Sequence, residues 1–161
     1  MDSMARAALI ALAPLLLVTT AARDGGAASG GIAIRAANGG VVELRNTGDL
    51  PVSIQPRLMI EQRDHGRWFD THVAIEAVAT CTDGTGSLLP TDRLTAPVTL
   101  QPHQRLSLVK WRGFTCSKQC PRICGANIYL GSGPFRYVAT VLPAGQRVIS
   151  AAFRMPTHPR R

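Results

Sequence analysis

Apolar and polar residues alternate over most of the chain, with the period of two that is typical of half-buried β-strands. The alternation begins at Ile32 and Ile34 and resumes at Val42 and Leu44. Between these two stretches lies the turn signal Asn38-Gly39-Gly40. We therefore predict two strands joined by a tight turn where the folded part of the chain begins.

The middle of the chain predicts a hairpin. After Asn46-Thr-Gly-Asp49, a second turn signal, the alternation continues through residues 52–60, with Pro56 marking a break or a bulge. Asp64-His-Gly66 is a hairpin turn, because its glycine can supply a positive φ. We predict that the return strand begins at Trp68 and alternates up to Cys81.

The second half of the chain predicts a long loop followed by further strands. Residues 82–97 are rich in Gly, Thr and Pro and should form a long loop, and residues 106–111 alternate again. Two strands follow, over 135–142 and 148–155, and residues 117–124 are the only helix candidate. Turn signals at intervals of about 8–12 residues predict an all-β, antiparallel sandwich or barrel of about seven to eight strands.

Four short segments, taken in order, resemble bacterial immunoglobulin-like β-sandwich domains. His103 stands where that family usually has glycine, and the cysteine-bearing insert 114–130 departs from its pattern. The resemblance implies an immunoglobulin-like sandwich without catalytic activity, because such domains mostly act as binding modules, spacers or accessory domains. The segments are Val42-Glu-Leu-Arg-Asn-Thr-Gly48, Arg57 to Trp68, Leu100-Gln-Pro-His-Gln-Arg-Leu106 and Gly133-Pro-Phe-Arg-Tyr137.

The N-terminus has the features of a secretory signal peptide. Arg6 precedes an apolar run over 7–18, which is interrupted by Pro14 and is too short for the roughly 20 residues of a membrane-spanning helix. We place cleavage after Ala22, with Ala28 as second choice, and a buried core helix is the alternative. The expected organisation is a signal peptide (1–22), a flexible leader (23–31), the sandwich (32–155) and a basic tail (156–161), exported to the periplasm or extracellular space without a membrane span.

The four cysteines are candidates for disulfide bonds. An even number of cysteines in an exported chain is typical of disulfides. Because three of them are clustered, we expect one of the three to pair with Cys81 and the other two with each other. A zinc site with all four thiolates is the competing interpretation. The clustered residues are Cys116, Cys120 and Cys124.

The charge of the chain is uneven. Lys and Arg number 18 against 10 Asp and Glu, a net charge of +8, and no acidic residue follows Asp92. This asymmetry favours an anionic partner, although an arginine-rich coding bias with selection for solubility would produce it too. The candidate anion-binding residues are Lys118, Arg122, Arg136, Arg147 and Arg154.

Few residues are arranged for catalysis. The histidines are scattered, without the H-x-x-x-H or H-E-x-x-H spacing of zinc enzymes. Glu61 and Glu76 are conceivable as a glycosidase pair, but we expect both to be solvated beside the hairpin. Trp68 and Trp111 are expected in or at the edge of the core, and an exposed tryptophan beside Arg136 would instead suggest sugar or base stacking. We expect no catalytic residue, no cofactor and no metal.

Two functional hypotheses follow. The first is an exported, non-catalytic immunoglobulin-like binding or structural module of the bacterial envelope, which contacts a protein or an envelope polysaccharide. The second is a basic envelope protein that binds polyanions. An exported inhibitor or enzyme is a weaker third. Nucleic acid is not expected as a partner, since the chain has no nucleic-acid-binding motif.

Overall fold

The computed structural model describes residues 31–78, 95–108, 110–115 and 127–157, which contain nine strands. A three-stranded antiparallel sheet has the order β1-β2-β7. It is built from two consecutive strands of the N-terminal hairpin and one short strand from much later in the chain. These strands are β1 (Ile32–Ala37), β2 (Val41–Asn46) and β7 (Arg105–Ser107).

The second sheet has six strands, all antiparallel to their neighbours, with β8 at its centre. Val138 of β8 pairs with both Met59 and Ile149, so β4 and β9 flank β8 on opposite sides. The far half of β8 pairs with β3, which in turn pairs with β6. The strands are β3 (Val52–Ile54), β4 (Arg57–Asp64), β5 (Arg67–Glu76), β6 (Val98–Leu100), β8 (Phe135–Leu142) and β9 (Gln146–Ile149).

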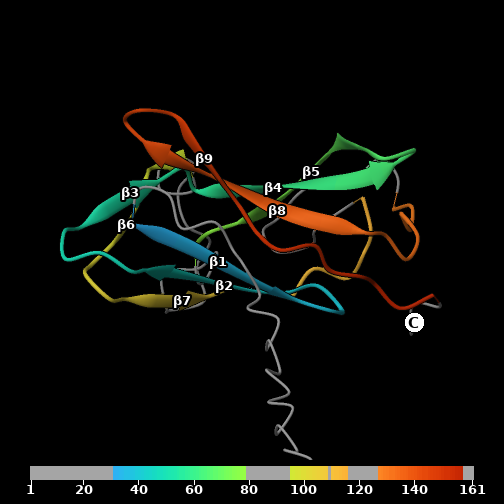
Figure 1. Cartoon of the computed structure of the whole chain (residues 1–161), viewed down its shortest axis with the longest axis horizontal. Coiled ribbons are helices and arrows are strands. Elements are labelled where there is room, and N and C mark those ends of the chain that lie inside the picture. Colours follow the sequence, from blue (N-terminus) through green and yellow to red (C-terminus); the bar gives the residue numbers. More distant parts are fainter. Residues whose placement is uncertain (1–30, 79–94, 109, 116–126, 158–161) are drawn as a thin grey trace, which may run out of the picture.

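The two sheets lie in separate layers and share one hydrophobic core (Figure 1). Their inward residues are those predicted by the period of two, including Ile32, Ile34, Val42 and Leu44, all of which are buried. An all-β fold of two antiparallel sheets is therefore confirmed, and it is compatible with a β-sandwich. The number of strands was underestimated, because the three-residue β6 directly follows the loop predicted over 82–97 and was not recognised as a strand.

An aromatic cluster fills one end of this core. Trp111 packs edge-on against Phe135, with ring centroids 4.9 Å apart, and Phe153 stacks on Tyr137 at 4.6 Å. Edge-to-face and offset-stacked pairs are the arrangements that ring quadrupoles favour. The indole Nε1–H donates to the carbonyl of Phe114, so Trp111 is buried with its polar atom satisfied. The prediction that Trp111 belongs to the core is confirmed.

The predicted turns are present, and the backbone explains their residues. Gly39 and Gly40 both have φ near +80°, and the β4–β5 hairpin turns at His65 and Gly66, which also have positive φ. His103 has a φ of +60°, the left-handed conformation that glycine adopts most readily. The position at which the resemblance expects glycine therefore has a glycine-like backbone while carrying histidine.

The predicted strand over 148–155 was too long. β9 ends at Ile149, and beyond it Phe153 forms one isolated bridge with Phe135. The cause lies at Ser150, whose hydroxyl accepts the backbone N–H of Tyr137 and donates to the carbonyl of Ala151. A side chain thus takes the place of a backbone acceptor in the ladder, and regular pairing stops there.

Tyr137 gives this core a predicted pH dependence. Its hydroxyl donates to the carbonyl of Gly40 at 2.8 Å, and burial raises its pKa far above the ordinary 10.0. Above pH 10.0 the unfolded chain loses this proton while the folded chain keeps it, so stability should fall by about 1.4 kcal/mol per pH unit. Urea unfolding across the alkaline range measures this slope. The Tyr137→Phe variant should lose it, and an equal slope in both proteins would contradict the assignment.

Candidate functional site

Three of the five predicted anion-binding residues lie within the described residues. Arg136 is on β8, Arg147 is on β9, and Arg154 follows in the C-terminal segment. Arg154 is exposed, as predicted. Lys118 and Arg122 lie outside the described residues, as do all four cysteines, so the disulfide and zinc interpretations both remain predictions.

The β4–β5 hairpin has a bulge next to Glu61, the carboxylate at the centre of this site. The register shifts between Ile60 and Glu61, which face Val73 and Asp70, so that Thr71 and His72 are extra residues on β5. The Thr71 hydroxyl donates to the carbonyl of Ile60 at 2.7 Å, and the His72 N–H donates to the Asp70 carboxylate at 2.7 Å. These bonds stabilise the bulge, and the register of β4 with β8 places Glu61 opposite Arg136.

Glu61 accepts from two arginines. Arg136 donates from Nε to one carboxylate oxygen at 2.7 Å, and its Nη2 forms an ion pair with the same oxygen at 2.6 Å. Arg147 donates to the other oxygen. We call these three residues, together with Trp68, the Glu61 cluster. It occupies the outer face of the six-stranded sheet, and both carboxylate oxygens are engaged.

Trp68 completes the Glu61 cluster. The guanidinium of Arg136 lies 4.3 Å from its ring centroid, a cation–π contact. Arg136 was predicted to face solvent, but its side chain is only 20% exposed, because it lies between the Trp68 ring and the Glu61 carboxylate. The predicted anion site on β8 and β9 is thus partly neutralised by a carboxylate from β4. Half-exposed Arg147 and exposed Arg154 remain open to solvent.

The expectation that Glu61 and Glu76 are solvated was wrong. Both are buried, at 9% and 4% exposure, and each has an arginine partner that offsets the cost of burying its charge. Arg57 approaches Glu76 at 3.4 Å. Arg57 lies opposite Glu76 and four residues before Glu61, which is about 13 Å along a strand. The two glutamates therefore belong to separate ion pairs and do not form a juxtaposed carboxylate pair.

The Glu61 cluster makes a testable contribution to stability. Glu61→Gln should lower the free energy of unfolding by about 1–3 kcal/mol, since Arg136 would be left partly buried without its counter-charge, while half-exposed Arg147 adds little. Urea unfolding at low and high salt measures this. The matched control Glu43→Gln, a partly exposed carboxylate without an ion pair to any described residue, should change stability by no more than about 0.5 kcal/mol. Equal effects of the two substitutions would show that the cluster is not stabilising.

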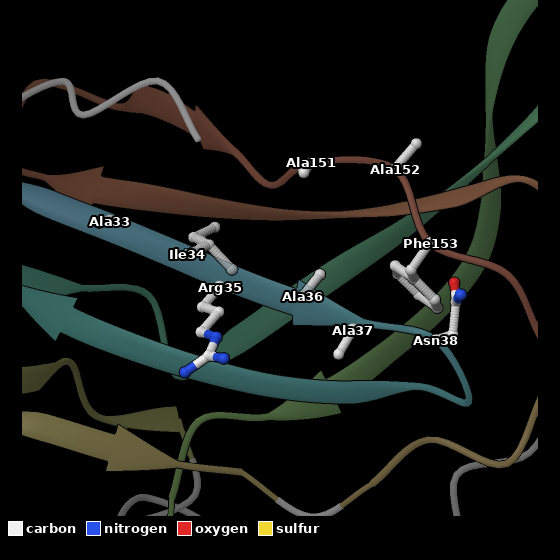
Figure 2. A pocket seen from close by; sticks show the side chains of 9 residues that line it. All are labelled: Ala33, Ile34, Arg35, Ala36, Ala37, Asn38, Ala151, Ala152 and Phe153. Atoms are coloured by element: carbon white, nitrogen blue, oxygen red, sulfur yellow. The ribbon is translucent and has the colours of Figure 1, made fainter. Parts of the chain in front are cut away.

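A shallow groove of about 670 Å³ runs between β1 and residues 151–153 (Figure 2). Its walls are mostly alanine, so the backbone of β1 lies close to the surface. Asn38, at one end, accepts the Arg154 N–H with its side-chain oxygen at 2.8 Å. Arg35 belongs to the lining, but its side chain extends from β1 over β2 and away from residues 151–153 (Figure 2).

Sequence reasoning found Arg136, Arg147 and Trp68 individually but did not bring them together. Within the described residues, no three His, Cys, Asp or Glu side chains gather as a metal-binding group. In the described part of the chain, no helix is long and apolar enough to cross a membrane. No protein-family model, curated protein or solved structure matches the chain.

Proposed function

We propose that this chain is an exported, non-catalytic immunoglobulin-like module that acts by binding another component of the bacterial envelope. The observation that carries the proposal is strand connectivity. In immunoglobulin-like sandwiches the first, second and fifth strands share one sheet, and the third, sixth and seventh share the other. Here β1, β2 and β7 form one sheet and correspond to the first, second and fifth strands. In the other sheet β4, β8 and β9 lie side by side and correspond to the third, sixth and seventh.

Two further features support the immunoglobulin-like assignment. Tyr137, near the start of β8, donates its hydroxyl to a backbone carbonyl of the opposite sheet, at Gly40. A tyrosine near the start of the sixth strand that bonds back to the backbone is a hallmark of these folds, although its usual acceptor lies only a few residues upstream. The chain reversal before β7 has a left-handed residue, His103, where the resemblance expects glycine.

Binding is favoured over catalysis because the Glu61 cluster is internally satisfied. A carboxylate that is to act as acid, base or nucleophile needs an oxygen directed at the substrate. Arg136 and Arg147 occupy both oxygens of Glu61. The cluster therefore links β4, β8 and β9 across the outer face of the sheet. This structural role favours a binding module over an enzyme.

Expression of the full chain in a bacterial host, followed by fractionation and intact-mass measurement, tests the export step. We expect an exported chain beginning after Ala22, with no alkylatable thiol. Purified mature protein should then sediment with isolated envelopes in a saturable manner. A cytoplasmic chain beginning at Met1 with four free thiols would overturn the proposal, and so would an exported chain that does not bind to envelopes.

A second candidate function, polyanion binding, is favoured by the charge of the described residues. They contain eleven arginine and lysine side chains against six carboxylates. Only Arg57, Arg136 and Arg147 of these eleven form ion pairs with a carboxylate in the described part of the chain. The other eight are available to an external anion.

A further inference from the structure

The outer face of the three-stranded sheet places two arginines directly opposite each other. Arg45 of β2 is in register with Arg105 of β7, and both are exposed. Their neighbours Leu44 and Leu106 point inward and contact the core, so the two guanidinium groups emerge on the same outer face.

The pairing type brings these arginines especially close. The N–H of Asn46 donates to the carbonyl of Gln104, and the N–H of Leu108 donates to that of Val42. Because hydrogen-bonded and non-hydrogen-bonded pairs alternate in an antiparallel ladder, Arg45 and Arg105 form a non-hydrogen-bonded pair. Side chains are closest in such pairs, with Cβ atoms about 4.5–5.5 Å apart.

A third arginine and a single carboxylate complete this face. Arg35 of β1 is opposite Glu43 of β2. This pair forms the row of outward side chains next to the row that contains Arg45. We call Arg35, Arg45 and Arg105 the arginine face. None of the three forms an ion pair with a carboxylate in the described residues. Asp49, another carboxylate of the described chain, contacts His103 at 3.2 Å.

Like charges directly opposite each other on a sheet are destabilising. Nothing in the packing requires them here, since both side chains project into solvent. An anion between the two guanidinium groups would remove the repulsion, and each guanidinium can bind a carboxylate, sulfate or phosphate through two parallel hydrogen bonds.

We propose that the arginine face binds an acidic polysaccharide, with Arg45 and Arg105 sharing one anionic group and Arg35 contacting the next. This inference rests on the second candidate function above. The remaining outward residues on these strands are small or polar, Ala33, Ala37 and Ser107, apart from Val41. They allow a flat sugar chain to approach, and they offer no aromatic ring for base stacking and little apolar surface for lipid insertion.

Two double variants with the same change in charge test the arginine face. Heparin oligosaccharides serve as the sulfated probe and polygalacturonate as the carboxylated probe, with affinity measured by calorimetry at several salt concentrations. R45A/R105A should weaken binding by about tenfold or more, the scale of losing charge-assisted hydrogen bonds. R63A/R67A, at the tip of the β4–β5 hairpin, removes two exposed arginines elsewhere and should change affinity less than about threefold.

A charge-preserving variant separates geometry from charge. R45K/R105K keeps both cations but loses the planar fork, so its affinity should lie between those of the wild type and R45A/R105A. Circular dichroism should show all variants folded, because these side chains project into solvent.

Each outcome is informative. Equal losses in both alanine double variants would show binding by net charge alone, which overturns the arginine face but leaves polyanion binding intact. Failure of the wild type to bind either probe would overturn both, without affecting the immunoglobulin-like assignment. Tighter binding to phosphatidylglycerol vesicles or to single-stranded DNA would overturn the polysaccharide assignment.

Discussion

Replacing Gly40 by alanine is expected to destabilise the domain by more than about 4 kcal/mol or to prevent folding, an exceptional effect for a single methyl group. Two causes act together. Gly40 has a φ of +80°, which costs an L-residue about 1–2 kcal/mol. Its added Cβ would also lie 2.1 Å from the backbone oxygen of Trp111, a distance that cannot be tolerated without moving the turn away.

Moving the turn would break other contacts. The carbonyl of Gly40 accepts both the Tyr137 hydroxyl, at 2.8 Å, and the Trp111 N–H, at 3.1 Å. These bonds link the β1–β2 turn to the other sheet and to the aromatic cluster. A displaced turn would therefore open one end of the core.

Gly39→Ala is the matched control for this substitution. Gly39 lies in the same turn with the same φ of +80°, but its added Cβ would meet only the flexible end of Lys110, at 3.4 Å. We expect a loss of about 1–2 kcal/mol from backbone strain alone. Urea unfolding of both variants measures the difference. Similar losses for Gly39→Ala and Gly40→Ala would show that Gly40 does not approach Trp111 closely.

Local patterns in the sequence were sufficient to predict most of the fold. The period of two identified Ile32, Ile34, Val42 and Leu44 as core residues because the side chains of a strand alternate between its faces. Turn glycines were predictable for a similar reason, since a positive φ is a property of single residues. The end of β9 was not, because it depends on the hydroxyl of Ser150 meeting the N–H of Tyr137 on a neighbouring strand.

The candidate sites depend on distant pairings that no local pattern contains. Glu61 meets Arg136 and Arg147 across separations of 75 and 86 residues. Those contacts require the order β4-β8-β9, with Glu61 in register with Arg136. The pairing of Arg45 with Arg105 depends in the same way on β7 lying beside β2.

The uneven charge along the sequence therefore does not give the distribution of charge on the folded surface. The excess of cations after Asp92 pointed to β8 and β9, but the sheet brings Glu61 to Arg136 and Arg147. The arginine face instead combines Arg35 and Arg45, from the half of the sequence with a net negative charge, with Arg105. Which charged side chains lie next to each other is determined by the order of the strands in the sheet and not by their positions along the chain.

Trp111→Ala should also destabilise the domain strongly, by about 3–5 kcal/mol, the usual cost of removing a buried tryptophan. Trp111 is 2% exposed and contacts both Phe135 and Phe153 edge-on. Its removal would leave a large cavity beneath the β1–β2 turn and would abolish the bond from Nε1–H to the Phe114 carbonyl. Denaturant unfolding followed by circular dichroism is the suitable measurement, because the substitution removes one of only two tryptophans.

Trp68→Ala is the control that separates core packing from surface contacts. Trp68 lies on the outer face of the six-stranded sheet, where its ring contacts the guanidinium of Arg136. Losing that contact should lower the free energy of unfolding by no more than about 1–2 kcal/mol. A cation–π pair that is partly exposed contributes less to stability than a fully buried one, and a partly buried ring contributes less than a fully buried ring. If Trp68→Ala were as destabilising as Trp111→Ala, the aromatic cluster around Trp111 would not be the centre of the core. A small effect of Trp68→Ala together with a large one of Trp111→Ala would place the main packing interface between the two sheets, which leaves their outer faces free to bind.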